Sequence, residues 1–206
     1  MEAKKIIITG SATRIGAAIA KSLAGYDRQL TLHYNKSSKE VKKLKNYLEN
    51  LGSKIFLIKA DLTKISQTKK IISQSFKMMG GVDCLINNAS IFEKDDLNNF
   101  NEKSFNKHML VNLQAPAILT QDFKKYLKSE KGNIINIIDQ RIFKLTPFFF
   151  SYTLSKTGLQ TLTKTSAMKL APNIRVKGVA PGPTIKNKRQ TNKHFKKQWK
   201  SLILKN

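Results

Sequence analysis

The sequence predicts an α/β domain with a doubly wound parallel sheet. Three observations lead to this prediction. Short runs rich in β-branched residues alternate with longer stretches of helical periodicity, the first such strand runs through glycines directly into a helix, and no internal repeat or low-complexity linker interrupts the pattern. With 206 residues the chain is long enough for one such domain with a substantial core, but not for two full domains. We therefore interpret residues 1–206 as a single domain.

Each element is expected from its own local pattern. The apolar, β-rich runs predict strands at residues 4–10, 29–35, 54–62, 82–90, 132–139 and 174–182. The helical stretches between them are residues 14–26, 38–52, 66–80, 102–129 and 151–171. The first helix is expected to end near Gly25 and the second at Gly52, while Pro116 should interrupt or bend the fourth. Strands that alternate with helices imply a parallel sheet covered on both faces.

The composition is strongly basic. The chain has 38 Lys+Arg against 13 Asp+Glu, a formal net charge of +25, and such an excess attracts polyanions. The lysines are spread along the chain, which is typical of solvent-facing helix positions, so nucleic acid is not expected as a partner. The single cysteine, Cys84, excludes an internal disulfide and a cysteine-based zinc site, and we expect no metal site.

The chain has the pattern of a cytoplasmic protein without a membrane partner. No apolar run approaches the roughly 18 residues of a membrane span. The N-terminus enters a strand within a few residues and lacks the layout of a signal peptide. A cytoplasmic enzyme is the expectation.

The stretch "TGSATRIG", Thr9 to Gly16, is a candidate phosphate-binding turn. A strand that leads through glycines into a helix N-terminus receives the pyrophosphate of a dinucleotide. Gly10 permits a sharp turn and Gly16 a close approach of helix and strand. A long cation in the middle of this turn, Arg14, indicates a ligand with an extra phosphate. The predicted cofactor-binding residues of the turn are Gly10, Thr13, Arg14, Ile15 and Gly16.

The end of the second strand, "LHYNKSS", indicates which dinucleotide binds. NAD-selective sites usually place a carboxylate there to bind the ribose 2′-OH, and this stretch has none. Lys36 and Ser37 can bind an anion and Arg14 can reach the same region, so we predict NADP(H) rather than an ordinary basic loop. After the third strand, Asp61 either meets the adenine amino group or caps the following helix. Further predicted cofactor contacts are His33, Tyr34, Asn35, Lys36, Ser37, Asp61 and Leu62.

A tyrosine and a lysine one helical turn apart are candidate catalytic residues. "SYTLSK" places Tyr152 and Lys156 on one face of a helix. A nearby ammonium favours the phenolate and brings the tyrosine, with an ordinary pKa of about 10, closer to proton exchange at neutral pH. Such a pair alone is common on protein surfaces. The glycine turn, "NNAS" after the fourth strand and a mid-helix asparagine, Asn112, make this combination specific.

With these motifs the chain resembles the short-chain dehydrogenase/reductase family over nearly its whole length. The resemblance implies a Rossmann fold and an NADP-dependent oxidoreductase acting on a small molecule. It implies that Tyr152 donates a proton, that Lys156 binds the nicotinamide ribose and lowers the tyrosine pKa, and that Asn112 supports a proton relay. The segments that carry the resemblance are Thr9–Gly16, Asp61, Asn87–Ser90, Asn112, Tyr152–Lys156 and Pro181–Gly182, and among them Asn88, Ala89, Ser90, Pro181 and Gly182 are implied cofactor contacts.

The departures from the common family pattern are similar to the pteridine reductase branch. Most members have serine where this chain has Asp139, glycine where it has Arg14, and glycine where it has Ser90. In that branch the arginine contacts the cofactor phosphate and lies near the pterin, and the aspartate relays protons with the tyrosine. Ser90 and Phe92 are then implied to help hold the substrate together with Arg14, Asp139 and Tyr152.

The chemistry of position 139 agrees with this resemblance. A carbonyl reductase needs a neutral donor to stabilise an oxyanion, and a carboxylate would repel that charge. Reduction of a C=N bond needs a hydride on carbon and a proton on nitrogen, which an acid paired with a tyrosine suits. Phe92 and the nicotinamide would stack a flat pterin or folate-like ring between them. Alternatively, Phe92 is core packing, Asp139 bonds to the backbone at the strand end, and "FFFSY" at residues 148–152 is either a substrate wall or helix-entry packing.

Two other functions stay open. One is a general carbonyl or 3-oxoacyl reductase. The other is an inactive reductase fold that binds RNA or another polyanion through its basic tail, near Phe195 and Trp199.

The resemblance also implies segments beyond Pro181–Gly182 that the sequence lacks. Relatives continue through a substrate-covering helix, a further helix and a last strand, whereas residues 183–206 read as a shortened substrate loop, with residues 191–204 as part of the cover. The last strand is expected to be missing, which would expose a sheet edge and remove surface that relatives use to form dimers or tetramers.

Overall fold

Six short strands form one parallel sheet in the computed structural model, which describes residues 4–127, 131–185 and 191–192. The sheet order is β3-β2-β1-β4-β5-β6, and all five pairings are parallel. The strands are β1 (Lys4–Ile8), β2 (Arg28–Tyr34), β3 (Lys54–Lys59), β4 (Cys84–Asn87), β5 (Gly132–Ile137) and β6 (Ile174–Val179). The predicted doubly wound sheet is confirmed.

The strand order reverses at β1, which pairs with β2 on one side and with β4 on the other. The chain runs outward from β1 to β3, crosses back to β4 and then continues outward in the other direction. In open α/β sheets ligands bind at such a switch point, outside the carboxyl ends of the strands. The topology thus places the candidate site at the ends of β1 and β4.

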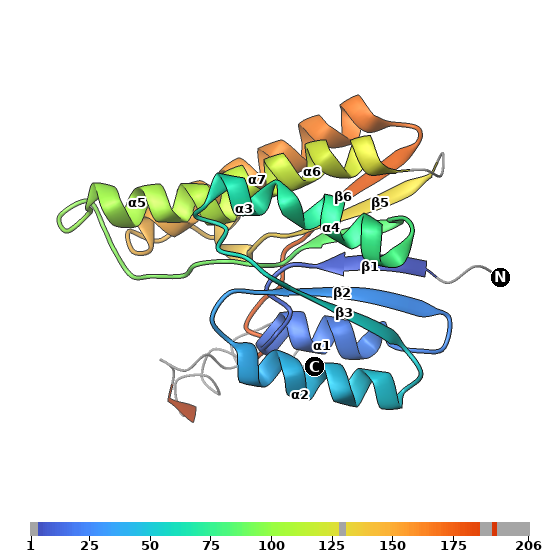
Figure 1. The fold of residues 1–206 in the computed structure, drawn as a ribbon. Coiled ribbons are helices and arrows are strands. Elements are labelled where there is room, and N and C mark those ends of the chain that lie inside the picture. The colour runs from blue at the N-terminus through green and yellow to red at the C-terminus, as the bar shows by residue number, and fades with distance from the viewer. Residues whose placement is uncertain (1–3, 128–130, 186–190, 193–206) are drawn as a thin grey trace.

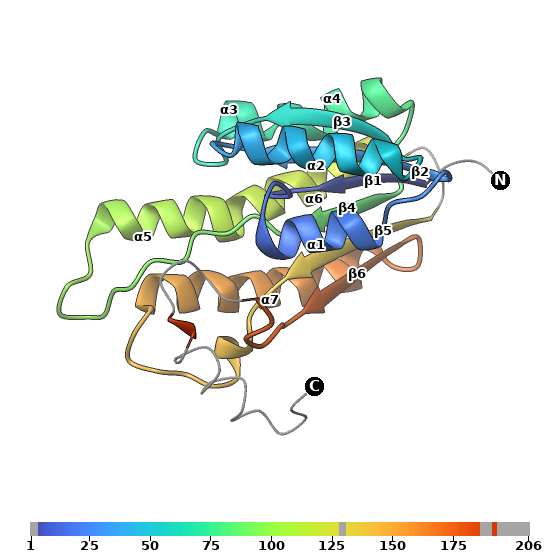
Figure 2. The same ribbon diagram turned by 90° about the horizontal axis from the view of Figure 1, so that it is seen from below.

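Helices cover both faces of the sheet (Figures 1 and 2). Two helices lie on one face, α1 (Arg14–Ser22) and α2 (Ser38–Asn50). The opposite face carries α3 (Ile65–Thr68), α4 (Lys70–Met79), α5 (Glu102–Met109), α6 (Ala115–Tyr126) and α7 (Phe150–Leu170). The core is correspondingly double: Ile7 belongs to the cluster under α4 and α6, and its neighbours Ile6 and Ile8 belong to the cluster under α1 and α2. This alternation follows from the period of two along a strand.

Two of the predicted helices are interrupted. The helix expected at residues 66–80 is split at Lys69 into α3 and α4, and the one expected at residues 102–129 contains a π-helical turn, η1 (Leu110–Gln114). Pro116 has no N–H to donate to the carbonyl of Asn112, so one α-helical bond is lost where the bend is expected. Residues 128–130, the predicted end of that helix, lie outside the described residues.

The strands end earlier than the apolar runs predict. β1, β3, β4, β5 and β6 all stop two to three residues short of the expected ends at 10, 62, 90, 139 and 182. The residues between the observed and the predicted strand ends all lie at the same edge of the sheet, and they supply much of the candidate site.

The far end of the sheet is formed by β6, which together with β3 is an edge strand of the described sheet. Of the covering segment expected at residues 191–204, only Thr191 and Asn192 are described; Phe195 and Trp199 lie outside the described residues. Across residues 4–127, 131–185 and 191–192, no helix combines the length and the apolar character needed to cross a membrane.

Candidate active site

A cavity of about 1620 Å³ opens at the carboxyl edge of the sheet. It exceeds the roughly 300–1,000 Å³ of a typical small-molecule site, so it has room for more than one ligand. Most of the predicted site residues line it: Gly10, Thr13, Arg14, Ile15, Gly16, His33, Asn35, Lys36, Asp61, Leu62, Asn88, Ala89, Ser90, Phe92, Asp139, Tyr152, Lys156, Pro181 and Gly182. Tyr34, Ser37 and Asn112 are not among the lining residues. In the described part of the chain, no group of three or more His, Cys, Asp or Glu side chains is arranged to hold a metal ion.

The glycine turn is held against the end of β4. Gly10 has a φ of +60°, and a Cβ on Gly16 would come within 2.6 Å of Asn88 Nδ2. That Nδ2 donates to the carbonyls of Thr9 and Gly10 at 2.9 and 3.0 Å. Thr9 Oγ1 in turn accepts from the backbone N–H groups of Asn88 and Ala89. Thr13, the N-cap of α1, makes no side-chain cap, which leaves the first amides of the helix to a ligand.

Arg14 and Lys36 give the cavity wall beside this turn a positive charge. Arg14 has a φ of +51°, a conformation that normally favours glycine, and its Nη2 donates to the carbonyl of Ile185 at 3.1 Å. Asp61, another predicted cofactor contact, accepts from Thr63 N at 2.9 Å and from Thr63 Oγ1 at 2.8 Å. The Thr63 backbone hydrogen bond is the main reason that the Asp61 pKa lies below its usual value. Asp61 both lines the cavity and orders its own turn.

The buried side chain of His33 links the glycine turn to the end of β3. The ring is buried, its Nδ1 accepts from Gly10 N at 3.1 Å, and its Nε2 lies 3.1 Å from the carbonyl of Ala60, to which it donates. Its own carbonyl accepts from the backbone N–H and the hydroxyl of Ser11. Both ring nitrogens are therefore committed to the backbone. Burial lowers the His33 pKa to about 4, and the ring is neutral at ordinary pH.

This arrangement makes His33 a source of acid sensitivity. The folded-state pKa of about 4 lies below the value of about 6.5 in the unfolded chain, so between these pH values the unfolded state binds more protons. We expect the free energy of unfolding to fall by up to about 3 kcal/mol from this group as the pH drops from 6.5 to 4. Urea unfolding of the wild type and of His33→Asn at several pH values measures it. The variant is expected to be less stable at pH 7 but to have a shallower pH dependence, and equal slopes would contradict the prediction.

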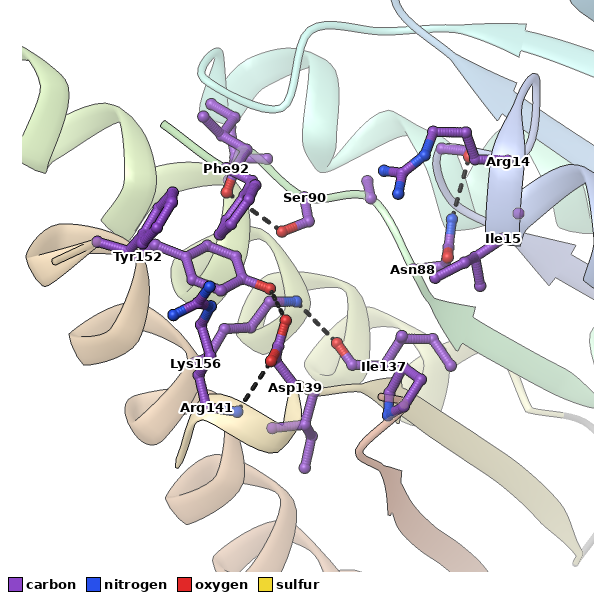
Figure 3. Close-up of a pocket in the computed structure, with 18 of the residues that line it drawn as sticks. Arg14, Ile15, Asn88, Ser90, Phe92, Ile137, Asp139, Arg141, Tyr152 and Lys156 are labelled. Carbon is purple, nitrogen blue, oxygen red and sulfur yellow. Dashed lines mark hydrogen bonds between the residues drawn. The ribbon is translucent and has the colours of Figure 1, made fainter. Parts of the chain in front are cut away.

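Tyr152, Asp139 and Lys156 meet on one side of the cavity (Figure 3). Tyr152 Oη donates to Asp139 Oδ2 at 2.7 Å. Asp139 Oδ1 accepts from the backbone N–H of Arg141 at 2.9 Å, so Asp139 also caps the short 3₁₀ helix η2 (Gln140–Ile142). Lys156 is buried, and its Nζ donates to the carbonyl of Ile137 at 2.8 Å. Both expected uses of Asp139, the tyrosine partner and the backbone acceptor at a strand end, are present.

The charges around the phenol differ from the sequence-based expectation. Burial first, and then the charge of Asp139 and its hydrogen bond, raise the pKa of Tyr152 above its ordinary value. Lys156 lies 5.8 Å from the ring centroid and donates to a carbonyl, and burial lowers its own pKa to about 8, against the effect of Asp139. The expected lowering of the tyrosine pKa is therefore wrong for this arrangement. The phenol therefore keeps its proton at neutral pH.

Asn112 is placed away from the Tyr152–Asp139 pair. Its Oδ1 accepts from Ile91 N at 2.8 Å, and its Nδ2 donates to Ile91 O and Ser155 Oγ, both at 3.0 Å. The side chain is fully buried within the π-helical turn η1. Asn112 thus joins the segment after β4 to α7, which carries Tyr152, and π-helical turns are frequent at functional sites.

Aromatic side chains form the next part of the wall. Phe92 stacks on Phe149 with ring centroids 4.4 Å apart and planes within 4°, and it meets Tyr152 edge-on at 4.6 Å. Arg141 Cζ lies 4.4 Å from the Phe149 centroid, on that same stack. One face of Phe92 is therefore covered by Phe149, which the sequence did not indicate. Phe148 and Phe149 line the cavity, and Phe150 is the first residue of α7. The three phenylalanines therefore serve both expected purposes, a cavity wall and packing at the start of a helix.

Two supporting residues were missed at the sequence level. Asp95 is buried and accepts hydrogen bonds from the backbone N–H and the hydroxyl of Ser151, the residue before Tyr152. Its carbonyl accepts from Phe149 N at 2.7 Å. His108 is buried too, 6.5 Å from the Tyr152 ring, and its Nε2 accepts from Glu93 N. Nothing in the local pattern separates Asp95 from its neighbour in "KDDL", because the contact joins distant parts of the chain.

Comparisons with known proteins identify the family and the fold. The family model for short chain dehydrogenase matches residues 4–197. An uncharacterized oxidoreductase of Methylorubrum extorquens is 30% identical over 183 residues, 88% of this chain and 73% of that protein. Two crystal structures of FolM alternative dihydrofolate reductase 1, each with NADP, superpose closely. The Brucella suis protein gives a TM-score of 0.93 at 37% identity, over 98% of this chain and 82% of its own. The Brucella canis protein gives 0.92 at 38%, over 98% and 80%.

Proposed function

This chain belongs to the short-chain dehydrogenase family of oxidoreductases, and from that premise we propose that it uses NADPH to reduce a C=N bond of a pterin or folate-like ring. The observation that carries the proposal is the 2.7 Å hydrogen bond between Tyr152 and Asp139 at the cavity wall. A carboxylate stands there beside the proton donor, where a carbonyl reductase needs a neutral hydroxyl. The likeness to two alternative dihydrofolate reductases supports the same substrate class.

The residues around the glycine turn fit NADP(H). A side chain at Gly16 would collide with Asn88, so glycine lets α1 pack closely on the turn, and the N-terminus of α1, which has no side-chain cap, is left for a pyrophosphate. Arg14 and Lys36 would bind the 2′-phosphate, since β2 ends without a carboxylate to repel it. Lys156 would hold the nicotinamide ribose. The two structures solved with NADP have the same fold.

The reaction needs one hydride and one proton. Bound NADPH supplies the hydride to the ring carbon and leaves as NADP⁺. Tyr152 delivers its proton to the ring nitrogen, which completes the CH–NH product. Its raised pKa makes the resulting phenolate strongly basic, so it takes a proton back readily. Asp139 accepts the hydrogen bond that orients the Tyr152 hydroxyl, and Lys156 stays bonded to the carbonyl of Ile137.

A substrate panel tests the proposal. With NADPH at pH 7, we expect kcat/KM for 7,8-dihydrobiopterin or 7,8-dihydrofolate to exceed that for a 3-oxoacyl thioester, a quinone and a simple ketone by at least about tenfold, because each of these would place an oxyanion beside Asp139. Reduction of the thioester with neglect of both pterins would overturn the proposal in favour of a general carbonyl reductase. Absence of NADPH fluorescence enhancement, with tight and salt-sensitive RNA binding, would favour the polyanion-binding alternative.

A further inference from the structure

The cavity wall carries a second group of cations that the proposed cofactor site does not use. Among the residues that the structure describes, seven cationic side chains line the cavity against two carboxylates, Asp61 and Asp139. Arg14 and Lys36 belong to the glycine-turn end and Lys156 to the centre. The remaining four are Lys94, Lys103, Lys107 and Arg141.

Two of these four lie against the aromatic wall. Lys94 follows Phe92 closely in sequence, and its Nζ lies 4.9 Å from the centroid of Phe148. Arg141 packs on the Phe149 ring. In Figure 3, Arg14 lies on one side of the Tyr152–Asp139 pair, and Phe92 and Arg141 lie on the other. The Tyr152–Asp139 pair thus lies between Arg14 at the glycine turn and Arg141 of this second group (Figure 3).

Helix α5 contributes the other two lysines. Lys103 and Lys107 are four residues apart, so they project from the same face of the helix toward the cavity. Lys107 Nζ pairs with Glu93 Oε1 at 3.0 Å. The ion pair partly neutralises Lys107, and Lys94 and Lys103 provide the positive charge at this end. Arg141 is engaged with Thr146 and the Phe149 ring.

We propose that the substrate carries an anionic tail, a carboxylate or a phosphate, that extends from the reacting ring along Phe148 and is bound by Lys94 and Lys103. The inference rests on the proposed function, because it takes the ring to lie beside Tyr152. An uncharged dihydropterin would leave both lysines without a ligand. A dihydrofolate-type substrate, with its charged tail, would place its carboxylates among them.

The test compares one ring with different tails. Steady-state kinetics with NADPH are measured for 7,8-dihydrofolate, 7,8-dihydroneopterin monophosphate and uncharged 7,8-dihydrobiopterin, on the wild type and on Lys94→Gln/Lys103→Gln. Exposed charge pairs contribute roughly 0.2–1 kcal/mol each, so the loss of two should raise KM for the tailed substrates about twofold to thirtyfold while leaving kcat and dihydrobiopterin kinetics unchanged. The difference in KM between the wild type and the double variant should become smaller at high salt, because salt screens exposed charges. Lys42→Gln/Lys43→Gln, exposed on α2 and outside the cavity lining, is the control with the same loss of charge.

The outcomes separate this inference from the proposed function. If the double variant raises KM only for dihydrofolate, the tail is a carboxylate. If it raises KM only for the phosphate ester, the tail is a phosphate. Equal effects on all three substrates, or none on any, would overturn the tail site while leaving pterin reduction intact. Failure of the wild type to reduce any of the three would overturn the proposed function, and the tail site with it.

Discussion

The Tyr152→Phe protein is expected to reduce a dihydropterin with kcat about 100-fold to 10,000-fold below the wild type, the usual contribution of a positioned general acid. The phenol is the proposed proton donor, and its hydrogen bond to Asp139 holds it in the cavity wall. Phenylalanine keeps the ring that packs edge-on against Phe92 and loses only the hydroxyl. Stopped-flow or steady-state NADPH oxidation measures kcat, and NADPH affinity should change by less than about twofold because the hydroxyl is not placed at the glycine turn.

Asp139→Asn is the companion variant that separates proton donation from charge. The amide can still accept from Tyr152, but the negative charge that helps to raise the tyrosine pKa is gone. The alkaline limb of the pH–rate profile should therefore move to lower pH, with a smaller loss of kcat than in Tyr152→Phe. If Tyr152→Phe kept more than half of the wild-type kcat, the phenol would not be the proton donor.

Cofactor selectivity is the second large effect. Replacing Arg14 by glycine and Lys36 by glutamine is expected to lower kcat/KM for NADPH about 100-fold and to leave that for NADH nearly unchanged, because only the phosphorylated dinucleotide carries the charge they bind. Glycine is a suitable replacement at position 14, since it accepts the φ of +51° without strain and removes the cationic side chain completely. The measurement is initial velocity against each dinucleotide at saturating dihydropterin.

Lys39, three residues after Lys36, offers a control for the loss of positive charge alone. Lys39→Gln removes one positive charge from the exposed start of α2, outside the cavity lining, and should leave the NADPH preference intact. A double variant that still prefers NADPH by the wild-type ratio would show that the extra phosphate is not recognised by Arg14 and Lys36.

The fold could be predicted from the sequence wherever one local pattern decides the element. The apolar runs gave all six strands because parallel strands are buried on both faces, and Gly10 and Gly16 marked the turn because only glycine fits there. The π-helical turn at Leu110–Gln114 could not be predicted beyond a bend near Pro116. Its form depends on buried contacts of Asn112 with Ile91 and Ser155, which no local periodicity records.

The sequence predicted which residues line the site more fully than it predicted the contacts that those residues make. Tyr152, Lys156 and Asp139 come together because an i, i+4 pair and a strand end meet at one sheet edge. Their pKa values depend on the hydrogen-bond partner of each side chain, which the sequence does not reveal. Lys156 donates to a carbonyl and does not stabilise the phenolate. The stack of Phe149 on Phe92 likewise joins segments distant in the chain.

Because every strand of the sheet runs the same way, the loops that form the cavity leave one edge, and the described residues of the turns at the other edge take no part in it. Tyr26, 91% exposed between α1 and β2, marks that other edge. An enzyme attached to a solid support through those turns would keep its cavity facing the solution. The same geometry makes them the natural place to fuse a reporter or a second enzyme without obstructing the entry of substrate.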